Sequence, residues 1–151
     1  MSTITNNHSP TFDYSTTHAN KTIIGVVRNS AELIGRALLA TLFLLSGIGK
    51  ITAYSAAAGY MASVGVPGAL LPLVIVVEIL GSVAIVLGWQ TRLVAVLLAG
   101  FTLMAGILFH NNFGDQTQMI MFLKNISITG AFLMLAANGA GRWSMDARKS
   151  I

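Results

Sequence analysis

Four long apolar segments alternate with polar links along the chain, at residues 33–51, 70–89, 93–110 and 119–138. Each is close to the roughly 20 residues that a helix needs to cross the hydrocarbon core of a bilayer. A chain inside lipid must satisfy its own backbone hydrogen bonds, and no two-residue barrel pattern is visible, so the segments predict helices. Because most links are short, we expect an all-α integral membrane protein built as a four-transmembrane-helix bundle with antiparallel neighbours.

The first 30 residues differ from the rest, since they are polar and rich in Thr, Asn, Ser and His. They predict a disordered cytoplasmic tail, followed by a membrane domain at 31–146 and a short cytoplasmic tail at 147–151. Within the first tail, "TIIGVV" at residues 22–27 either lies against the membrane surface or continues the first helix. Asn29 as N-cap and Glu32 three residues later form a capping-box pattern, which predicts that the first span begins here.

The longest link between spans covers residues 53–68. Tyr54, Ala58 and Met61 fall on one helical face, so the link predicts a short interfacial helix, ended by the glycines and proline that follow. Lipid removes the hydrophobic drive between helices, so the spans are expected to touch at small residues. The candidates are Gly47, Gly81, Ala99, Gly106 and Gly130.

Composition supports the membrane interpretation, because 54% of residues are hydrophobic, 9% are charged and the mean hydropathy is +0.74. A soluble domain carries about 25% charged residues. The chain has no Cys, which excludes disulfides and Fe–S clusters built from its own ligands. The net charge of +4 results from nine Lys and Arg against five Asp and Glu. The basic residues mostly flank the apolar segments, so they indicate how the protein is oriented in the membrane and do not indicate nucleic-acid binding.

The distribution of these basic residues predicts that both termini face the cytoplasm. With that orientation only two of the nine, Lys50 and Lys124, lie on the outer side. The cytoplasmic side then holds Lys21, Arg28, Arg36, Arg92, Arg142, Arg148 and Lys149.

The second span, "LLPLVIVVEILGSVAIVLGW", carries one carboxylate, Glu78. Ionisable residues inside a membrane are costly and usually face the bundle interior. At about 1.5 Å per helical residue, Glu78 lies roughly 12 Å and Lys124 roughly 7–8 Å from the outer ends of their spans. This depth estimate favours a Glu78–Lys124 ion pair, with Lys50 as the second choice of partner and Arg36 as the third.

Two interpretations of these polar residues stay open. In the first, Glu78, Lys124, His110 and Asn125 line a pocket that opens to the outer leaflet and binds a quinone-like head group or carries protons. In the second, an ion pair fixes the helix register while Lys50, Arg92 and His110 only reach toward the interface. A metal site is not indicated, because His110 shares its loop with one acid only.

The ordered set of motifs resembles the DoxX family of small four-helix membrane proteins, in particular its bacterial inner-membrane members. The resemblance covers residues 31–146, essentially everything except the tails. It rests on "GRALLATLFLLSGIGKI", "GYMASVGVPG", "VVEILGSVAIVLGWQTR" and "LKNISITGAFLMLAANGAGRWSMD". It implies a four-span fold in the bacterial inner membrane.

Some members of that family are associated with thiosulfate:quinone oxidoreductase or with membrane redox complexes. The resemblance therefore makes Arg36, Glu78 and Lys124 candidates for a quinone or partner site. Since the chain has no cofactor ligands of its own, we expect an accessory subunit of a quinone-linked redox complex and no independent enzyme activity. The alternatives are a small proton-coupled transporter or channel-like carrier, which would need a homo-oligomer, and a structural membrane scaffold.

Overall fold

The computed structural model describes the backbone of residues 14–148, with side chains described from residue 21. Its elements are α1 (Tyr14–Thr52), α2 (Tyr54–Ser63), the 3-10 turn η1 (Gly68–Leu70), α3 (Leu71–Leu87), α4 (Thr91–Phe109), α5 (Gln116–Asn138) and α6 (Met145–Arg148). Within this described part, four helices are long and apolar enough to cross a membrane: α1 from Lys21, η1 with α3, α4 and α5. The predicted all-α, four-span fold is confirmed, and the predicted link helix is α2.

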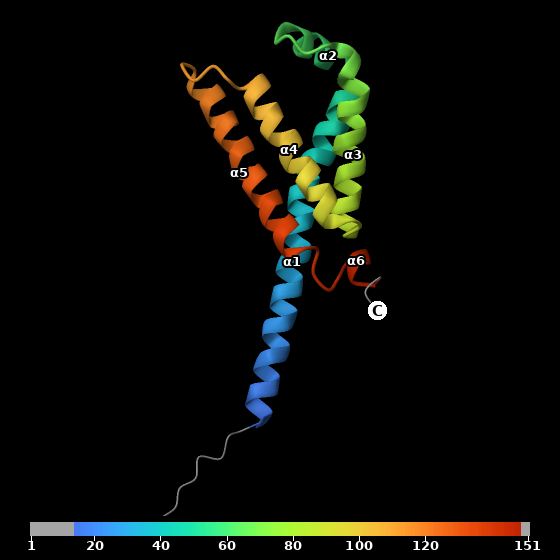
Figure 1. Ribbon diagram of the computed structural model, residues 1–151, viewed down its shortest axis with the longest axis vertical. Helices are drawn as coiled ribbons and strands as arrows, with labels where there is room; N and C mark the ends of the chain where they lie inside the picture. The colour runs from blue at the N-terminus through green and yellow to red at the C-terminus, as the bar shows by residue number, and fades with distance from the viewer. Residues whose placement is uncertain (1–13, 149–151) are drawn as a thin grey trace, which may run out of the picture.

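The helix α1 begins much earlier than expected. It has 39 residues, or about 58 Å at 1.5 Å per residue, and its first half projects beyond the other helices (Figure 1). The prediction of a disordered tail is therefore wrong for residues 14–30, where "TIIGVV" continues the first helix; residues 1–13 lie outside the described range. The capping-box prediction is also wrong, because Asn29 lies in the middle of α1 and is buried.

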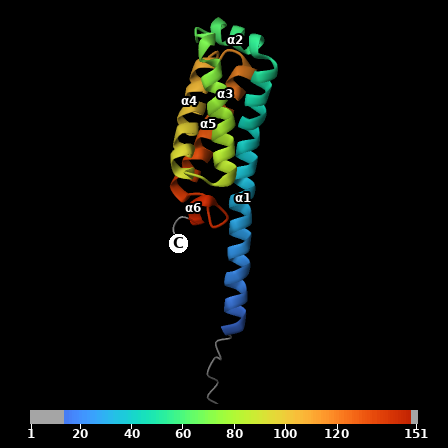
Figure 2. The same ribbon diagram turned by 90° about the vertical axis from the view of Figure 1, so that its right-hand side faces the viewer.

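The four long helices form two pairs. Helix α1 packs mainly on α3 and α4 packs mainly on α5, while α3 and α4 join the pairs. The pairs lie close together near the α3–α4 turn and diverge toward the opposite end (Figure 1). At that open end α2 lies across the bundle (Figure 2).

Close helix contacts occur at small residues, as predicted, at four of the five candidates. A side-chain carbon on Gly47 would lie 2.8 Å from Ile79 of α3, and one on Gly81 would lie 2.9 Å from Leu98 of α4. Ala99 is buried and Gly106 lies against Asn125 of α5. Gly130 was predicted wrongly, because it is exposed and nothing lies within 4 Å of its missing side chain.

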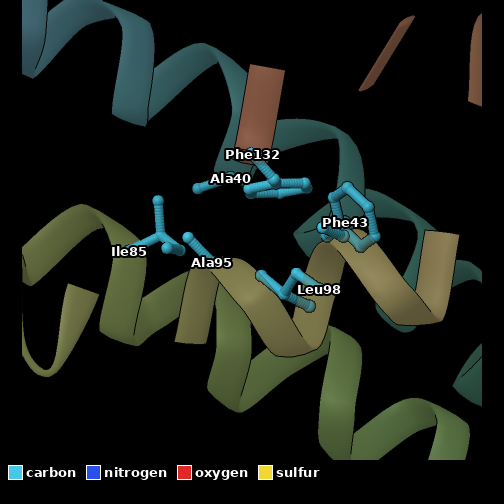
Figure 3. Packing of buried hydrophobic residues seen from close by; sticks show 7 residues of the cluster. Ala40, Phe43, Ile85, Ala95, Leu98 and Phe132 are labelled. Carbon is cyan, nitrogen blue, oxygen red and sulfur yellow. The ribbon is translucent and has the colours of Figure 1, made fainter. Parts of the chain in front are cut away.

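The core lies between the helix pairs, where buried side chains from α1, α3, α4 and α5 pack together (Figure 3). The ring of Phe43 from α1 meets the ring of Phe132 from α5 edge-on at 5.3 Å between centroids. The buried cluster is completed by Ala40, Ile85, Ala95, Leu98 and Ala99. Aromatic edge-to-face contacts of this kind stabilise packing beyond the area they bury.

The outward faces of the spans carry large apolar side chains. Leu38, Leu80, Leu97 and Met134 are each at least 60% exposed, one on each long helix. A water-soluble monomer rarely leaves so extensive an apolar surface uncovered. These apolar faces are therefore suited to contact with the lipid chains of a membrane.

Candidate functional site: a charged cavity at the open end of the bundle

A cavity of about 530 Å³ lies where the two helix pairs diverge. Its walls are mostly apolar side chains from α1, α3, α4 and α5, and residues of α2 close it at one end. The core residue Phe43 also lines it, so the packed core forms the inner floor. Seven polar side chains complete the lining: Ser46, Lys50, Glu78, Thr102, His110, Lys124 and Asn125.

Glu78 accepts hydrogen bonds from α1 within this cavity. It is 4% exposed, and the Lys50 ammonium donates to its two carboxylate oxygens at 2.8 and 3.0 Å. The hydroxyl of Ser46 lies 3.1 Å from the same carboxylate and accepts from Lys50 at 2.7 Å. The cluster therefore compensates the buried negative charge with one cation and one hydroxyl.

The predicted Glu78–Lys124 pair is wrong. The helix pairing explains the difference, because α1 packs directly against α3 whereas α5 packs against α4. Ser46 and Lys50 are four residues apart, so they share one face of α1. The close approach at Gly47 brings that face within reach of Glu78.

Three further polar residues lie on the α4–α5 side of the cavity. His110 Nδ1 is 2.8 Å from Oε1 of Gln118, and Asn125 donates from its side chain to the Met121 carbonyl at 3.1 Å. Lys124 is exposed and makes no hydrogen bond or ion pair with any residue of the described part. The lining holds two lysines, Lys50 and Lys124, against one acid, Glu78, so these three side chains carry a formal net charge of +1.

An aromatic contact joins α2, which lies across the end of the cavity, to α4. Tyr60 of α2 stacks on Phe109 at the end of α4, with 5.6 Å between ring centroids. Both residues line the cavity, and so does the buried Met61. The contact ties α2, which follows α1, to the opposite helix pair.

Arg36 does not line this cavity, although the family resemblance made it a candidate for the same site as Glu78. It is 1% exposed and lies at the other end of the bundle. Its guanidinium donates to the carbonyls of Ile85 at 3.4 Å, Val86 at 3.2 Å and Trp143 at 2.6 Å. Arg36 therefore caps the end of α3 and fastens the C-terminal segment to it.

Two features of the structure were missed by sequence reasoning. Ser46 belongs to the cavity cluster, and its four-residue spacing from Lys50 was the available signal. Asp146 accepts hydrogen bonds from the backbone N–H groups of Gln90 and Thr91, both at 2.8 Å, and so caps α4 from the far end of the chain. No local periodicity signals a contact of that kind.

A four-span helical bundle with a charged cluster inside an apolar cavity defines a small multi-pass membrane protein. The family model for DoxX matches residues 31–111, and the chain belongs to the DoxX family. It is 47% identical over 114 residues to the inner membrane protein YqjF of Escherichia coli K12, covering 76% of this chain and 88% of that one. It is 38% identical over 131 residues to the inner membrane protein YphA of the same organism, covering 82% and 94%.

No solved structure matches the chain. The two relatives and the four apolar helices agree on the location, and the protein is a multi-pass protein of the inner membrane.

Proposed function

We propose that the protein is an accessory subunit of a membrane redox complex and that its cavity holds a quinone-like molecule. The observation that carries the proposal is the cavity itself. Its volume of about 530 Å³ falls within the roughly 300–1,000 Å³ typical of small-molecule sites. Ligand sites of this class are mainly apolar, with a few polar groups that orient the ligand.

The polar groups are arranged to suit a ring that carries oxygen atoms at opposite edges. Lys50, Ser46 and Glu78 form a hydrogen-bonded polar cluster on the α1–α3 wall, and His110 and Asn125 lie on the α4–α5 wall. An isoprenoid or other apolar tail would lie against the aliphatic side chains of α3 and α4. The chain itself supplies no redox centre in this proposal, so a partner subunit exchanges electrons with the bound quinone.

Photocrosslinking with a photoreactive quinone in native membranes, combined with copurification, tests this proposal. We expect labelled peptides from α3 and α4, loss of labelling in Glu78→Gln, and recovery of a redox partner. Arg92→Gln is the matched control, because Arg92 is a charged residue outside the cavity lining, next to the α3–α4 turn. Unchanged labelling in Glu78→Gln, or purification without any redox protein, would contradict the proposal.

A second candidate function is proton-coupled transport, and one observation favours it. A carboxyl group and an imidazole, Glu78 and His110, line the same cavity. The core at Phe43 closes the inner end, so a carrier would need a second conformation or a second copy of the chain. Proton flux into proteoliposomes that is abolished by Glu78→Gln would support transport, whereas flux that is indifferent to this change would exclude it.

A further inference from the structure

Lys124 is a membrane-embedded cation for which the described part of the protein provides no counter-ion. It lies eight residues, about 12 Å, from the first residue of α5 and lines the cavity. The acid in the cavity lining, Glu78, has both carboxylate oxygens bound by Lys50. The cavity therefore holds one positive charge more than its own side chains balance.

A positive charge without a counter-ion is energetically unfavourable inside a membrane-spanning segment. A cation beside apolar walls inside a membrane segment loses hydration, and the usual solutions are a counter-ion or an approach to the lipid surface. Met121, Asn125 and Ile128 of the same helix also line the cavity, and none of them carries a negative charge. A neutral quinone does not cancel the charge, but an anionic group does.

We propose that the cavity binds an acyl amphiphile whose anionic head group pairs with Lys124. The apolar chain would lie along the wall formed by Leu73, Val74 and Val77 of α3 and by Met104 and Leu108 of α4, all of which line the cavity. The head group, a carboxylate or a phosphate, would accept hydrogen bonds from Lys124 and from the amide of Asn125 beside it. The inference uses the same cavity as the proposed function and specifies the charge and the class of its ligand.

The two probes that test the proposal share one acyl chain, and only one of them has an anionic head group. A photoactivatable long-chain fatty acid and its methyl ester are each offered to the full-length protein in nanodiscs of neutral lipid. We expect the acid to label the cavity peptides at least about tenfold more strongly than the ester, the gain typical of one charge-assisted hydrogen bond. Equal labelling by the two probes would overturn the proposal.

Variants at position 124 assign the effect to this residue. Lys124→Arg keeps the charge and should keep the preference for the acid, whereas Lys124→Gln should abolish it. Lys21→Gln is the matched control, since Lys21 is also exposed but lies on the projecting half of α1. Lys124 is exposed and without a partner in the described part, so Lys124→Gln should fold normally, and elution as a single species in gel filtration checks this. A preference for the acid that survives in Lys124→Gln would leave Lys124 as an interfacial cation only and overturn the proposal.

Two further arms separate the possible sources of the anion and the two proposals. Competition by an unlabelled anionic phospholipid identifies a lipid phosphate as the natural partner, and competition by free fatty acid alone identifies a carboxylate; competition by neither overturns the proposal. A photoreactive quinone is used in parallel. Acid labelling that depends on Lys124, together with no quinone labelling of the wild type, supports the anionic ligand and removes the quinone. Quinone labelling without any acid preference does the reverse.

Discussion

Lys50 and Glu78 form an ion pair that joins the last turn of α1 to α3, with 2.8 Å between the ammonium nitrogen and Oε1. The carboxylate side chain is 5% exposed and the lysine side chain 28%. Removing one partner of such a pair leaves a buried charge uncompensated, which is more destabilising than removing both.

We therefore expect Lys50→Met to lower the free energy of unfolding by about 3 kcal/mol, and the double variant with Glu78→Leu to recover most of that loss. Denaturation in mixed detergent micelles measures both values. Lys124→Met is the control and should cause no loss of stability, because Lys124 has no ion-pair partner in the described part of the protein. If the two single losses simply add in the double variant, the ion pair is not the source of the effect.

Two glycines that are two residues apart on α1, Gly47 and Gly49, give a second prediction. An alanine carbon at Gly47 would lie 2.8 Å from Ile79, whereas nothing lies within 4 Å of one at Gly49. Gly47→Ala should destabilise the protein by about 1–3 kcal/mol through overpacking, and Gly49→Ala should stabilise it by about 0.5–1 kcal/mol through helix propensity. Thermal unfolding in detergent compares them, and two variants with the same sign would refute the α1–α3 contact.

The cap that Asp146 provides for α4 predicts a local effect. Asp146→Ala removes the acceptor for the N–H groups of Gln90 and Thr91, and the loss of a helix cap costs about 1 kcal/mol. Hydrogen exchange should accelerate in the first turn of α4 and stay unchanged in the first turn of α5. Asp115→Ala, which removes the side-chain cap of α5 at Gln118, should give the opposite pattern. Uniform acceleration in both helices would contradict a local cap.

Replacing Arg36 should release the C-terminal segment. Arg36→Met leaves the Trp143 carbonyl without the guanidinium donor that lies 2.6 Å away, and each unsatisfied group costs about 1–3 kcal/mol. Trypsin should then cut after the exposed Arg142 faster than in the wild type, with Arg36→Lys intermediate. Arg92→Met is the control for loss of a nearby charge. An unchanged cleavage rate in Arg36→Met would show that other contacts hold the segment.

The placement of basic residues predicts that both termini lie in the cytoplasm, which would place α2 and the cavity on the outer half of the membrane. A reporter that is active only in the cytoplasm, fused after Ile151, should be active, and a reporter inserted after Gly65 in the link should not. Activity in the reverse order would invert the predicted orientation. It would also move the cavity to the cytoplasmic half.

The spans were predictable because length and apolar composition alone decide whether a helix crosses a bilayer. The start of α1 was not, since the polar residues before Ala31 are compatible with both a tail and a helix. Their helical state depends on the long helix that they continue, and a local capping pattern at Asn29 and Glu32 pointed the other way. Asn29 is instead buried within α1.

The partner of Glu78 was not predictable from depth, because depth does not say which helices are neighbours. The depth estimate allowed both Lys124 and Lys50 as partners, and the packing of α1 on α3 selects Lys50. The roles of Arg36 and Asp146 depend on contacts across 107 and 55 residues of chain, which leave no local pattern. The rarity of charged residues inside a membrane was enough to identify the candidate residues. Only the fold shows that Glu78 lines the cavity whereas Arg36 binds the C-terminal segment.

The separation between Arg36 and its last acceptor also has a consequence for biosynthesis. Trp143 follows Arg36 by 107 residues, and at about 5–20 residues per second the ribosome needs roughly 5–20 seconds to make that stretch. During this interval the first span carries a guanidinium whose final acceptor does not yet exist. The nascent helix must therefore keep Arg36 hydrated or shielded by the insertion machinery, and the contact between Arg36 and Trp143 can form only after Trp143 has been made.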